Sequence, residues 1–215
     1  MRTRQRKLLY ALSACVILMV TLAVAWSALP TPVAPALAWQ TSAASGPLMD
    51  TPIPNFGVVE QGILYRSAQP HELALPWLRR YGIASIVNLR EERYDDGDWL
   101  IARLGFTSYL RLPIDNHTPP TDAQALAFLE FVQDQRNWPV LVHCAEGKGR
   151  TGVLVALTRY AIDGWSVEQA LAEANKYTTD GALNETQRAW LAQWARTHAP
   201  GDQRATPQPA AKQEE

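Results

Sequence analysis

The stretch VLVHCAEGKGRTG, residues 140–152, decides the fold. Its first three residues are apolar without polar alternation, as expected of a central strand that is covered on both faces. A glycine-rich turn follows and leads into an apolar helical pattern at 151–163. Successive N–H groups in such a turn, together with the positive end of the helix, form an anion site. The stretch therefore predicts a buried strand, a phosphate-binding loop and a helix.

Short apolar runs alternate with amphipathic patterns on both sides of this stretch. We expect strands at 63–65, 84–89, 108–112 and 139–143, and helices at 72–81, 98–104, 122–136, 151–163, 167–177 and 185–198. This alternation is typical of an α/β fold with a central, mostly parallel sheet of about four to five strands flanked by helices.

Three of the expected helices carry a start signal. A capping box needs Ser, Thr or a similar residue three positions before Glu or Gln, and that spacing or a near variant of it occurs at Thr121 and Gln124, Ser166 and Gln169, and Asn184 and Gln187.

Composition limits the class of protein. The 215 residues carry a formal net charge of −1, which fits one ordinary domain with tails and disfavours nucleic acid as a partner. Of the two cysteines, Cys15 lies in an N-terminal apolar run, so Cys144 has no partner for a disulfide within the soluble part. The four histidines are scattered, and we expect no metal and no cofactor.

The N-terminus has the pattern of a membrane segment. Basic residues within 1–7 precede an uncharged apolar run at 8–29, long enough to cross a bilayer, and the next basic residue is Arg66. We expect a single-pass anchor with a cytoplasmic N-terminus and an extracytoplasmic domain. A cleaved signal peptide is the alternative, because 23–25 and 36–38 have the small-x-small form of cleavage sites; the domain would then be secreted or periplasmic. Lipidation at Cys15 is disfavoured because the apolar run continues beyond it.

These patterns divide the chain into five parts. We expect a cytoplasmic basic segment at 1–7, a transmembrane anchor or signal segment at 8–29, a flexible linker at 30–54, the folded domain at 55–199 and a disordered tail at 200–215.

Three interpretations compete for the glycine-rich turn. Residues 147–152 match G-x-G-x-x-G, but a dinucleotide site needs a second strand ending in an acid about twenty residues on, and only helical patterns follow. A nucleoside-triphosphate loop would need glycine where Val142 stands, five residues before the Gly147-Lys148 pair, and Ser or Thr where Gly149 stands. The third interpretation, His-Cys-x5-Arg followed by Thr-Gly, accounts for every residue from His143 to Gly152.

This motif resembles the signature of the cysteine-dependent protein tyrosine and dual-specificity phosphatase superfamily. The resemblance covers roughly 55–198, because LYRSAQP at 64–70 and IVNLR at 86–90 also resemble the early strands of bacterial dual-specificity-like members. It implies a phosphoric monoester hydrolase that acts on a phosphorylated protein or small phosphoester.

The placement of Cys144 and Arg150 predicts their roles. A cysteine at a helix N-terminus among N–H donors is stabilised as the nucleophilic thiolate, so we expect Cys144 to form a phosphocysteine intermediate. Arg150 offers a planar fork to two phosphate oxygens. Ala145, Glu146, Gly147, Lys148 and Gly149 would form the phosphate-binding loop; Lys148 is equally well explained as a solvated loop residue.

The leaving oxygen needs a proton from a nearby acid. Asp115 is the candidate, in the loop LPIDNHTPP at 112–120, which is similar in place and spelling to the superfamily's acid loop. Sliding the match by one residue would put Asn116 in that place, and Asn cannot donate the proton.

Further roles concern residues around the loop. His143 is expected to orient it through hydrogen bonds and Thr151 to assist departure of the thiolate. Gln187 is similar to a glutamine that positions water in some family members, and a capping partner for Asn184 is the alternative. Arg90 and Arg93 are best explained as parts of a solvated charged turn.

Several alternatives stay open for the function. Ala145 stands where strongly phosphoinositide-directed members carry lysine, which disfavours an inositol phosphate or phospholipid substrate without excluding it. A catalytically silent phosphate-binding module should lack Cys, Arg or the acid. An arsenate-reductase-like enzyme should carry more cysteines, and a sulfurtransferase would not need the Asp115 loop.

Overall fold

The structure is a computed structural model that describes residues 50–92, 103–178 and 183–204. All of them belong to one of the two units into which the chain divides, Trp39–Glu215. The expected membrane segment at 8–29 and most of the expected helix at 98–104 lie outside the described residues. Among the residues that are described, no helix is long and apolar enough to cross a membrane.

Five strands form one sheet in the order β1-β2-β5-β3-β4. They are β1 (Gly57–Glu60), β2 (Leu64–Ser67), β3 (Ser85–Arg90), β4 (Ser108–Ile114) and β5 (Val140–His143). β1 pairs antiparallel with β2, and the other three pairings are parallel. The expected mostly parallel sheet is confirmed. β1 was not predicted; it pairs with β2 across a tight turn at 61–63.

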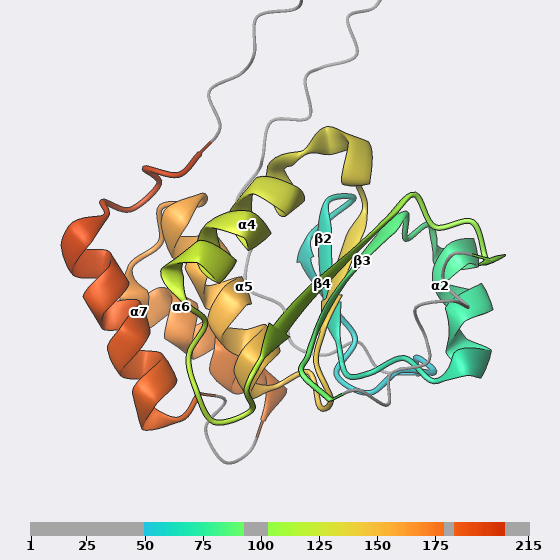
Figure 1. The fold of residues 1–215 in the computed structure, drawn as a ribbon, viewed down its shortest axis with the longest axis horizontal. Helices are drawn as coiled ribbons and strands as arrows, with labels where there is room; N and C mark the ends of the chain where they lie inside the picture. The colour runs from blue at the N-terminus through green and yellow to red at the C-terminus, as the bar shows by residue number, and fades with distance from the viewer. Residues whose placement is uncertain (1–49, 93–102, 179–182, 205–215) are drawn as a thin grey trace, which may run out of the picture. The chain divides into compact units, whose positions relative to one another are not determined.

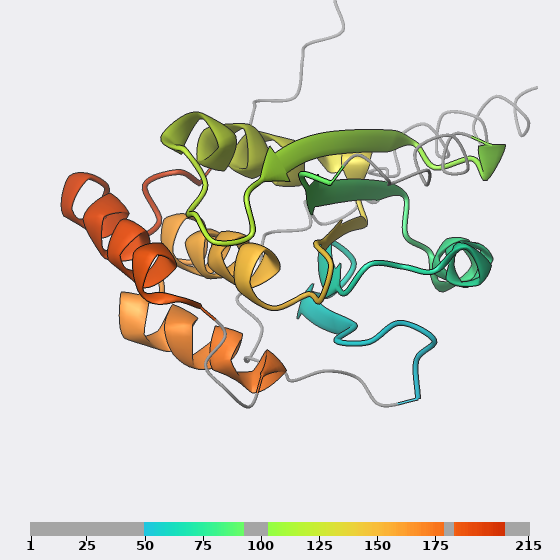
Figure 2. The same cartoon turned by 60° about the horizontal axis from the view of Figure 1, so that its bottom comes forward.

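Helices cover both faces of the sheet. Figures 1 and 2 show α2 (Leu75–Tyr81) on one side and α4 (Asp122–Gln133), α5 (Gly149–Ala161), α6 (Val167–Ala174) and α7 (Glu185–Thr197) on the other. Three expected helices are shorter in α-form, because 3-10 turns occupy η1 (Glu72–Ala74), η2 (Gln135–Asn137) and η3 (Asn175–Tyr177). Such turns are common at helix ends.

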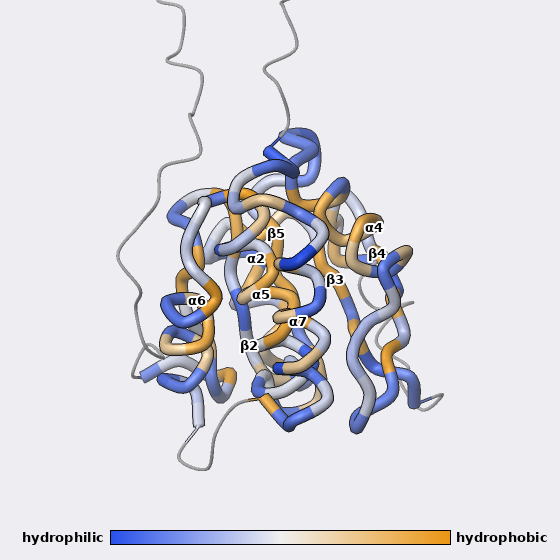
Figure 3. Tube along the Cα trace, turned by 90° about the vertical axis from the view of Figure 1, so that its left-hand side faces the viewer, coloured by the Kyte–Doolittle hydropathy of each residue, from blue (hydrophilic) through white to orange (hydrophobic). Residues whose placement is uncertain are grey.

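β5 is buried on both faces, as its sequence predicts. Val140 and Val142 pack in the larger apolar cluster, which includes α5, whereas Leu141 packs in the smaller cluster with Leu75 and Leu78 of α2. Figure 3 shows the apolar residues gathered along β5, β3 and α5. The strand that leads into the signature loop is therefore fixed by packing from two directions.

All three capping boxes are present. The N-cap side chains of Thr121, Ser166 and Asn184 each accept a hydrogen bond from the backbone N–H three residues on, and the glutamine there accepts from the N-cap backbone. These reciprocal bonds satisfy donors that a helix start leaves open. The spacing in the sequence therefore located the starts of α4, α6 and α7.

Ordered contacts extend slightly past both expected domain boundaries. Ile53 is buried, and Ala68 donates a 2.8 Å backbone hydrogen bond to the carbonyl of Pro54. At the other end, Gly201 N–H donates to the Tyr160 carbonyl at 2.9 Å.

Candidate active site

The expected site residues gather at the carboxyl edge of the parallel strands. The register pairs Ser67 with His143 and Asn88 with His143, so β2, β3 and β5 end side by side. Asp115 follows β4, which is the neighbour of β3. Ligand sites of parallel sheets lie at this edge, because the loops there face the same side.

Cys144 directly follows β5 and is 3% exposed. α5 begins five residues later without a side-chain cap at Lys148, so the first N–H groups of the helix are left for another acceptor. Nδ1 of the buried His143 ring lies 3.3 Å from the Cys144 carbonyl oxygen. Because a carbonyl only accepts, this contact requires the hydrogen on Nδ1. The expected orienting role of His143 fits this geometry.

The loop from Ala145 to Gly149 curls tightly against the end of β2. Gly147 has φ +70°, and a Cβ there would lie 2.5 Å from the backbone of Ser67 and Ala68. Only glycine fits such a position. Beside it, the Lys148 ammonium lies 3.1 Å from the Glu146 carboxylate, and both side chains are exposed to solvent, so the two form a surface ion pair.

The Arg150 side chain is 2% exposed, and its guanidinium is held by Glu92 and by the Ile114 carbonyl. Nη1 and Nη2 each lie 3.3 Å from a carboxylate oxygen of Glu92, and Nη1 also donates to the Ile114 carbonyl at 3.2 Å. The buried Nε has no hydrogen-bond partner among the described residues. The guanidinium is therefore held in one orientation, while the Nε–H and the second Nη2–H form no hydrogen bond among the described residues.

Asp115 is exposed at the start of its loop, and its carboxylate accepts a 2.8 Å bond from the His117 N–H. The His117 carbonyl in turn accepts from Asn184 Nδ2 and Thr186 Oγ1, each at 3.1 Å. The N-terminus of α7 is thus hydrogen-bonded to the Asp115 loop. The bond from Arg150 to Ile114 places the residue before Asp115 against the signature arginine.

Thr151 lies in α5 and Gln187 in α7, and both side chains are buried. The Thr151 hydroxyl has no hydrogen-bond partner within the described ranges. Gln187 forms the expected capping box through Oε1, while its buried Nε2 has no partner in the same ranges. The capping interpretation of Gln187 is confirmed, and its amide group retains donors for a water.

A family model described as "DSP-PTPase phosphatase fused to NAD+ Kinase" matches residues 49–192. The chain belongs to this phosphatase family. The resemblance seen in the signature is thereby confirmed, over a region that includes the sheet, the signature loop and most of α7.

Curated relatives carry phosphatase names. The chain is 34% identical over 112 residues to the dual specificity protein phosphatase TpbA of Pseudomonas aeruginosa, covering 51% of this chain and 49% of the relative. It is 33% identical over 129 residues to the inositol diphosphatase DSP3 of Arabidopsis thaliana, covering 58% and 63%. The chain thus spans about half to two thirds of the length of these relatives.

Solved structures show the same fold. P. aeruginosa TpbA with a Cys-to-Ser substitution, in complex with pTyr, is 28% identical with a TM-score of 0.58, covering 71% of this chain and 91% of that chain. The core catalytic domain of the PP-IP phosphatase SIW14 from S. cerevisiae is 23% identical with a TM-score of 0.57, covering 68% and 94%. The latter likeness concerns the fold alone.

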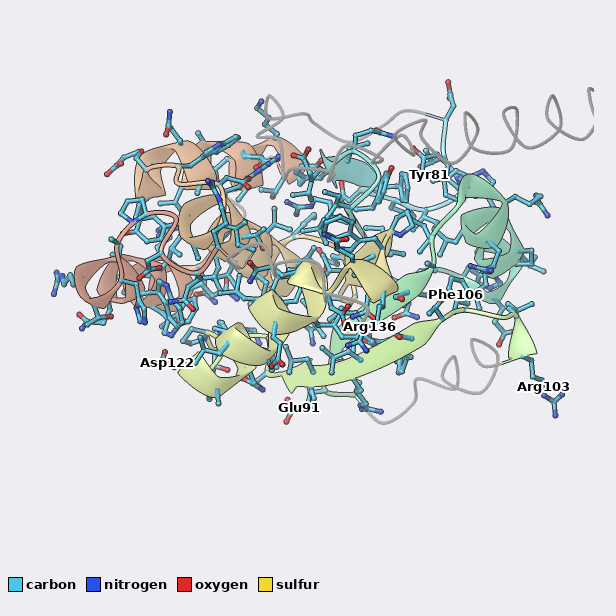
Figure 4. All side chains as sticks on the ribbon, turned by 90° about the horizontal axis from the view of Figure 1, so that it is seen from above. Tyr81, Glu91, Arg103, Phe106, Asp122 and Arg136 are labelled. Atoms are coloured by element: carbon cyan, nitrogen blue, oxygen red, sulfur yellow. The ribbon has the colours of Figure 1, made fainter. Side chains whose placement is uncertain are left out.

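Three residues at the site were not predicted from the sequence. Glu92 was placed in a solvated turn; Glu91 does point away from the molecule (Figure 4), but the Glu92 carboxylate pairs with Arg150. Arg66 and Asn55 were not singled out, and each contacts the phosphate-binding loop. No spacing rule connects these residues to the signature, because they meet it only through the fold.

Glu92 should contribute stability that depends on pH. Burial raises the pKa of Glu92, but its backbone N–H and Arg150 outweigh burial and lower the pKa from 4.5 to about 2. A lowered pKa gives stability that is complete above the ordinary value and is lost as the pH falls toward 2. Because Glu92 is 42% exposed, Glu92→Gln should lower the melting temperature at pH 7 by only about 1–3 °C.

Melting curves between pH 7 and pH 3 check this expectation. The difference between wild type and Glu92→Gln should narrow below about pH 4.5. Glu91→Gln is the matched control and should match wild type throughout, because Glu91 is also exposed but makes no ion pair among the described residues. A Glu92→Gln difference that stays constant down to pH 3 would contradict the ion pair.

Asn184 should affect catalysis as well as stability, whereas Ser166 should affect stability alone. Both are N-caps, and loss of such a cap costs about 0.5–2 kcal/mol. Only Asn184 also bonds the Asp115 loop, through the His117 carbonyl. Chemical denaturation and steady-state assays should show similar destabilisation by Asn184→Ala and Ser166→Ala, with kcat reduced roughly three- to tenfold only in the first. Equal kcat values in the two variants would show that the bond from Asn184 to the His117 carbonyl does not affect catalysis.

Proposed function

We propose that the chain is a cysteine-dependent phosphoric monoester hydrolase of the protein tyrosine and dual-specificity type. The observation that carries this proposal is the meeting of Cys144, the glycine-rich loop and the buried Arg150 at the carboxyl edge of the sheet. A thiolate at Cys144 would precede a helix start that has no side-chain cap, and the same helix carries Arg150, so the segment offers the positive groups that a phosphoryl group needs.

The first step transfers the phosphoryl group to sulfur. The Cys144 thiolate attacks phosphorus, the bond to the ester oxygen breaks, and Asp115 gives its proton to the departing oxygen. Arg150 and the loop N–H groups bind the equatorial oxygens throughout. The Arg150–Ile114 bond favours this assignment, because it brings the start of the Asp115 loop to the arginine.

The second step hydrolyses the phosphocysteine. Asp115, now ionised, accepts a proton from water as the water oxygen bonds to phosphorus and the S–P bond breaks. The free Nε2 hydrogens of buried Gln187 are suited to orient that water, and the Thr151 hydroxyl is suited to donate to the departing sulfur. Phosphate leaves, and the thiolate is restored.

We further propose an aryl phosphate, such as phosphotyrosine in a protein, as the preferred substrate. Two of the cations near the loop are paired with acids: Lys148 pairs with Glu146 at 3.1 Å, and Arg90 pairs with Glu92 at 3.3 Å. A mouth whose outer cations are partly neutralised attracts polyanions less strongly than a fully basic one. The pTyr complex of TpbA is consistent with this choice, while the inositol diphosphatase relatives name the competing substrate class.

We propose an extracytoplasmic location for the domain, with 8–29 as the membrane segment. The support is the sequence alone, namely basic residues within 1–7 and none from 8 to 65. Protease added to intact cells or spheroplasts should degrade the domain of the full-length protein. Protection until the membrane is lysed would overturn this topology.

Mutation of the nucleophile and of the acid should have separable effects. We expect the full-length protein to hydrolyse an aryl phosphate under reducing conditions with a chelator present. Cys144→Ser should reduce kcat by at least about 10³-fold, because the nucleophile is lost. Asp115→Asn should reduce it by about 10²- to 10⁴-fold for a poor leaving group, and less for a good one such as p-nitrophenolate, which needs less protonation.

Asn116→Ala is the matched control for the acid, since its side chain is also exposed in the same loop. It should retain activity if Asp115 is the acid. Full activity in Cys144→Ser, or an inactive wild type, would leave a phosphate-binding module as the better description. A kcat/KM for an inositol diphosphate above that for a phosphotyrosine peptide would overturn the proposed substrate preference while leaving the mechanism intact.

A further inference from the structure

Three consecutive carbonyl groups of the phosphate-binding loop are bonded to donors from the N-terminal part of the domain. The Ala145 carbonyl accepts from the Gln69 N–H at 3.0 Å. The next two accept from side chains: Asn55 Nδ2 lies 2.8 Å from the Glu146 oxygen, and Arg66 Nη2 lies 2.6 Å from the Gly147 oxygen. All three donors lie between residues 55 and 69, on one side of the loop.

This pattern fixes where the loop's N–H groups point. In a trans peptide, the C=O of one residue and the N–H of the next are antiparallel. Carbonyls that point toward Asn55, Arg66 and Gln69 therefore turn the N–H groups of residues 146, 147 and 148 to the opposite side. None of the backbone hydrogen bonds among the described residues uses these three N–H groups. They are left for an anion inside the loop.

We propose that Asn55 and Arg66 are positioning residues that hold the peptide planes of the phosphate-binding loop in the orientation that binds a tetrahedral oxyanion. The proposal rests on the proposed function in naming phosphate as the ligand. Neither residue touches the phosphate; each acts through a loop carbonyl.

Arg66 is suited to this role by its burial. Its side chain is 0% exposed, and its guanidinium carbon lies 3.6 Å from the Tyr177 ring centroid. Burial lowers the pKa of Arg66 to about 10, with the charges of Tyr177, Glu173 and Cys144 acting in the opposite direction. Arg66 is therefore a cation at neutral pH, placed behind the loop. A planar guanidinium can stack flat on the ring while its Nη2 donates to the Gly147 carbonyl, whereas an ammonium has no planar face and no fixed donor direction.

Asn55 is suited to the positioning role by its backbone conformation. It has φ +54°, a left-handed conformation that Asn tolerates better than most residues, and it lies two residues before β1. Since Gly57 pairs with Arg66, this places Asn55 at the same end of the sheet as the loop. Asp50 has φ +59° and makes no hydrogen bond or ion pair with the loop among the described residues, so it offers a matched position for comparison.

The test is binding of tungstate, a tetrahedral oxyanion, to the full-length protein by calorimetry, together with KM for an aryl phosphate. Asn55→Gly removes the donor and keeps a residue that accepts positive φ. We expect its dissociation constant for tungstate to rise about tenfold, equivalent to about 1.4 kcal/mol, with KM rising in parallel. Asp50→Gly should leave both values unchanged. Melting curves establish that each variant is folded at the assay temperature.

Arg66→Lys is the second variant, because it keeps the buried charge and removes the planar donor. A rise of at least fivefold in the tungstate dissociation constant of the folded variant supports the proposal. Wild-type tungstate affinity in folded Asn55→Gly or folded Arg66→Lys overturns it for that residue, as does an equal loss in Asp50→Gly. If wild type binds tungstate but hydrolyses no phosphoester, the proposed function fails and the calorimetric comparison still decides this inference.

Discussion

The contact between the signature loop and the end of β2 constrains the whole site. Gly147 approaches Ser67 and Ala68 so closely that a Cβ would lie 2.5 Å from their backbone. That approach puts the loop within reach of Arg66, whose bond to the Gly147 carbonyl spans 81 residues of sequence. The curl of the loop, its anion-binding face and the place of the nucleophile all follow from how β2 and β5 pair.

The parallel sheet then brings the remaining groups together without long loops. Neighbouring parallel strands end at one edge, so the segments after β3, β4 and β5 supply Glu92, Asp115 and Cys144. Arg150 connects the three segments, since it follows Cys144 in the chain and bonds both Glu92 and the Ile114 carbonyl. A single side chain thereby couples the orientation of the phosphate-binding fork to the position of the acid loop.

The sequence predicted what depends on local pattern and missed what depends on long-range pairing. Four strands, the helix after the signature and three capping boxes were recognisable because each has its own periodicity or spacing. β1 was missed because its pairing with β2 across a turn makes it a strand, and no signal for that turn was recognised in the sequence. The Asn55 and Glu92 contacts join residues 91 and 58 positions apart, and neither side chain belongs to a spacing motif that would predict its partner.

The buried arginines show why the site should prefer an anion. Arg159 is surrounded by acids: it bonds Glu173 at 2.6 Å and Asp163 at 2.7 Å, so its burial is compensated. Arg66 is equally buried, yet its described hydrogen bond goes to a neutral carbonyl, its Nε and Nη1 have no partner among the described residues, and Glu173 acts on it only through its charge. A buried charge is costly unless an opposite charge lies near. Negative charge on an oxyanion held in the loop reduces that cost further. Arg66 therefore favours a phosphorylated ligand in the loop while its own hydrogen bond goes to the Gly147 carbonyl.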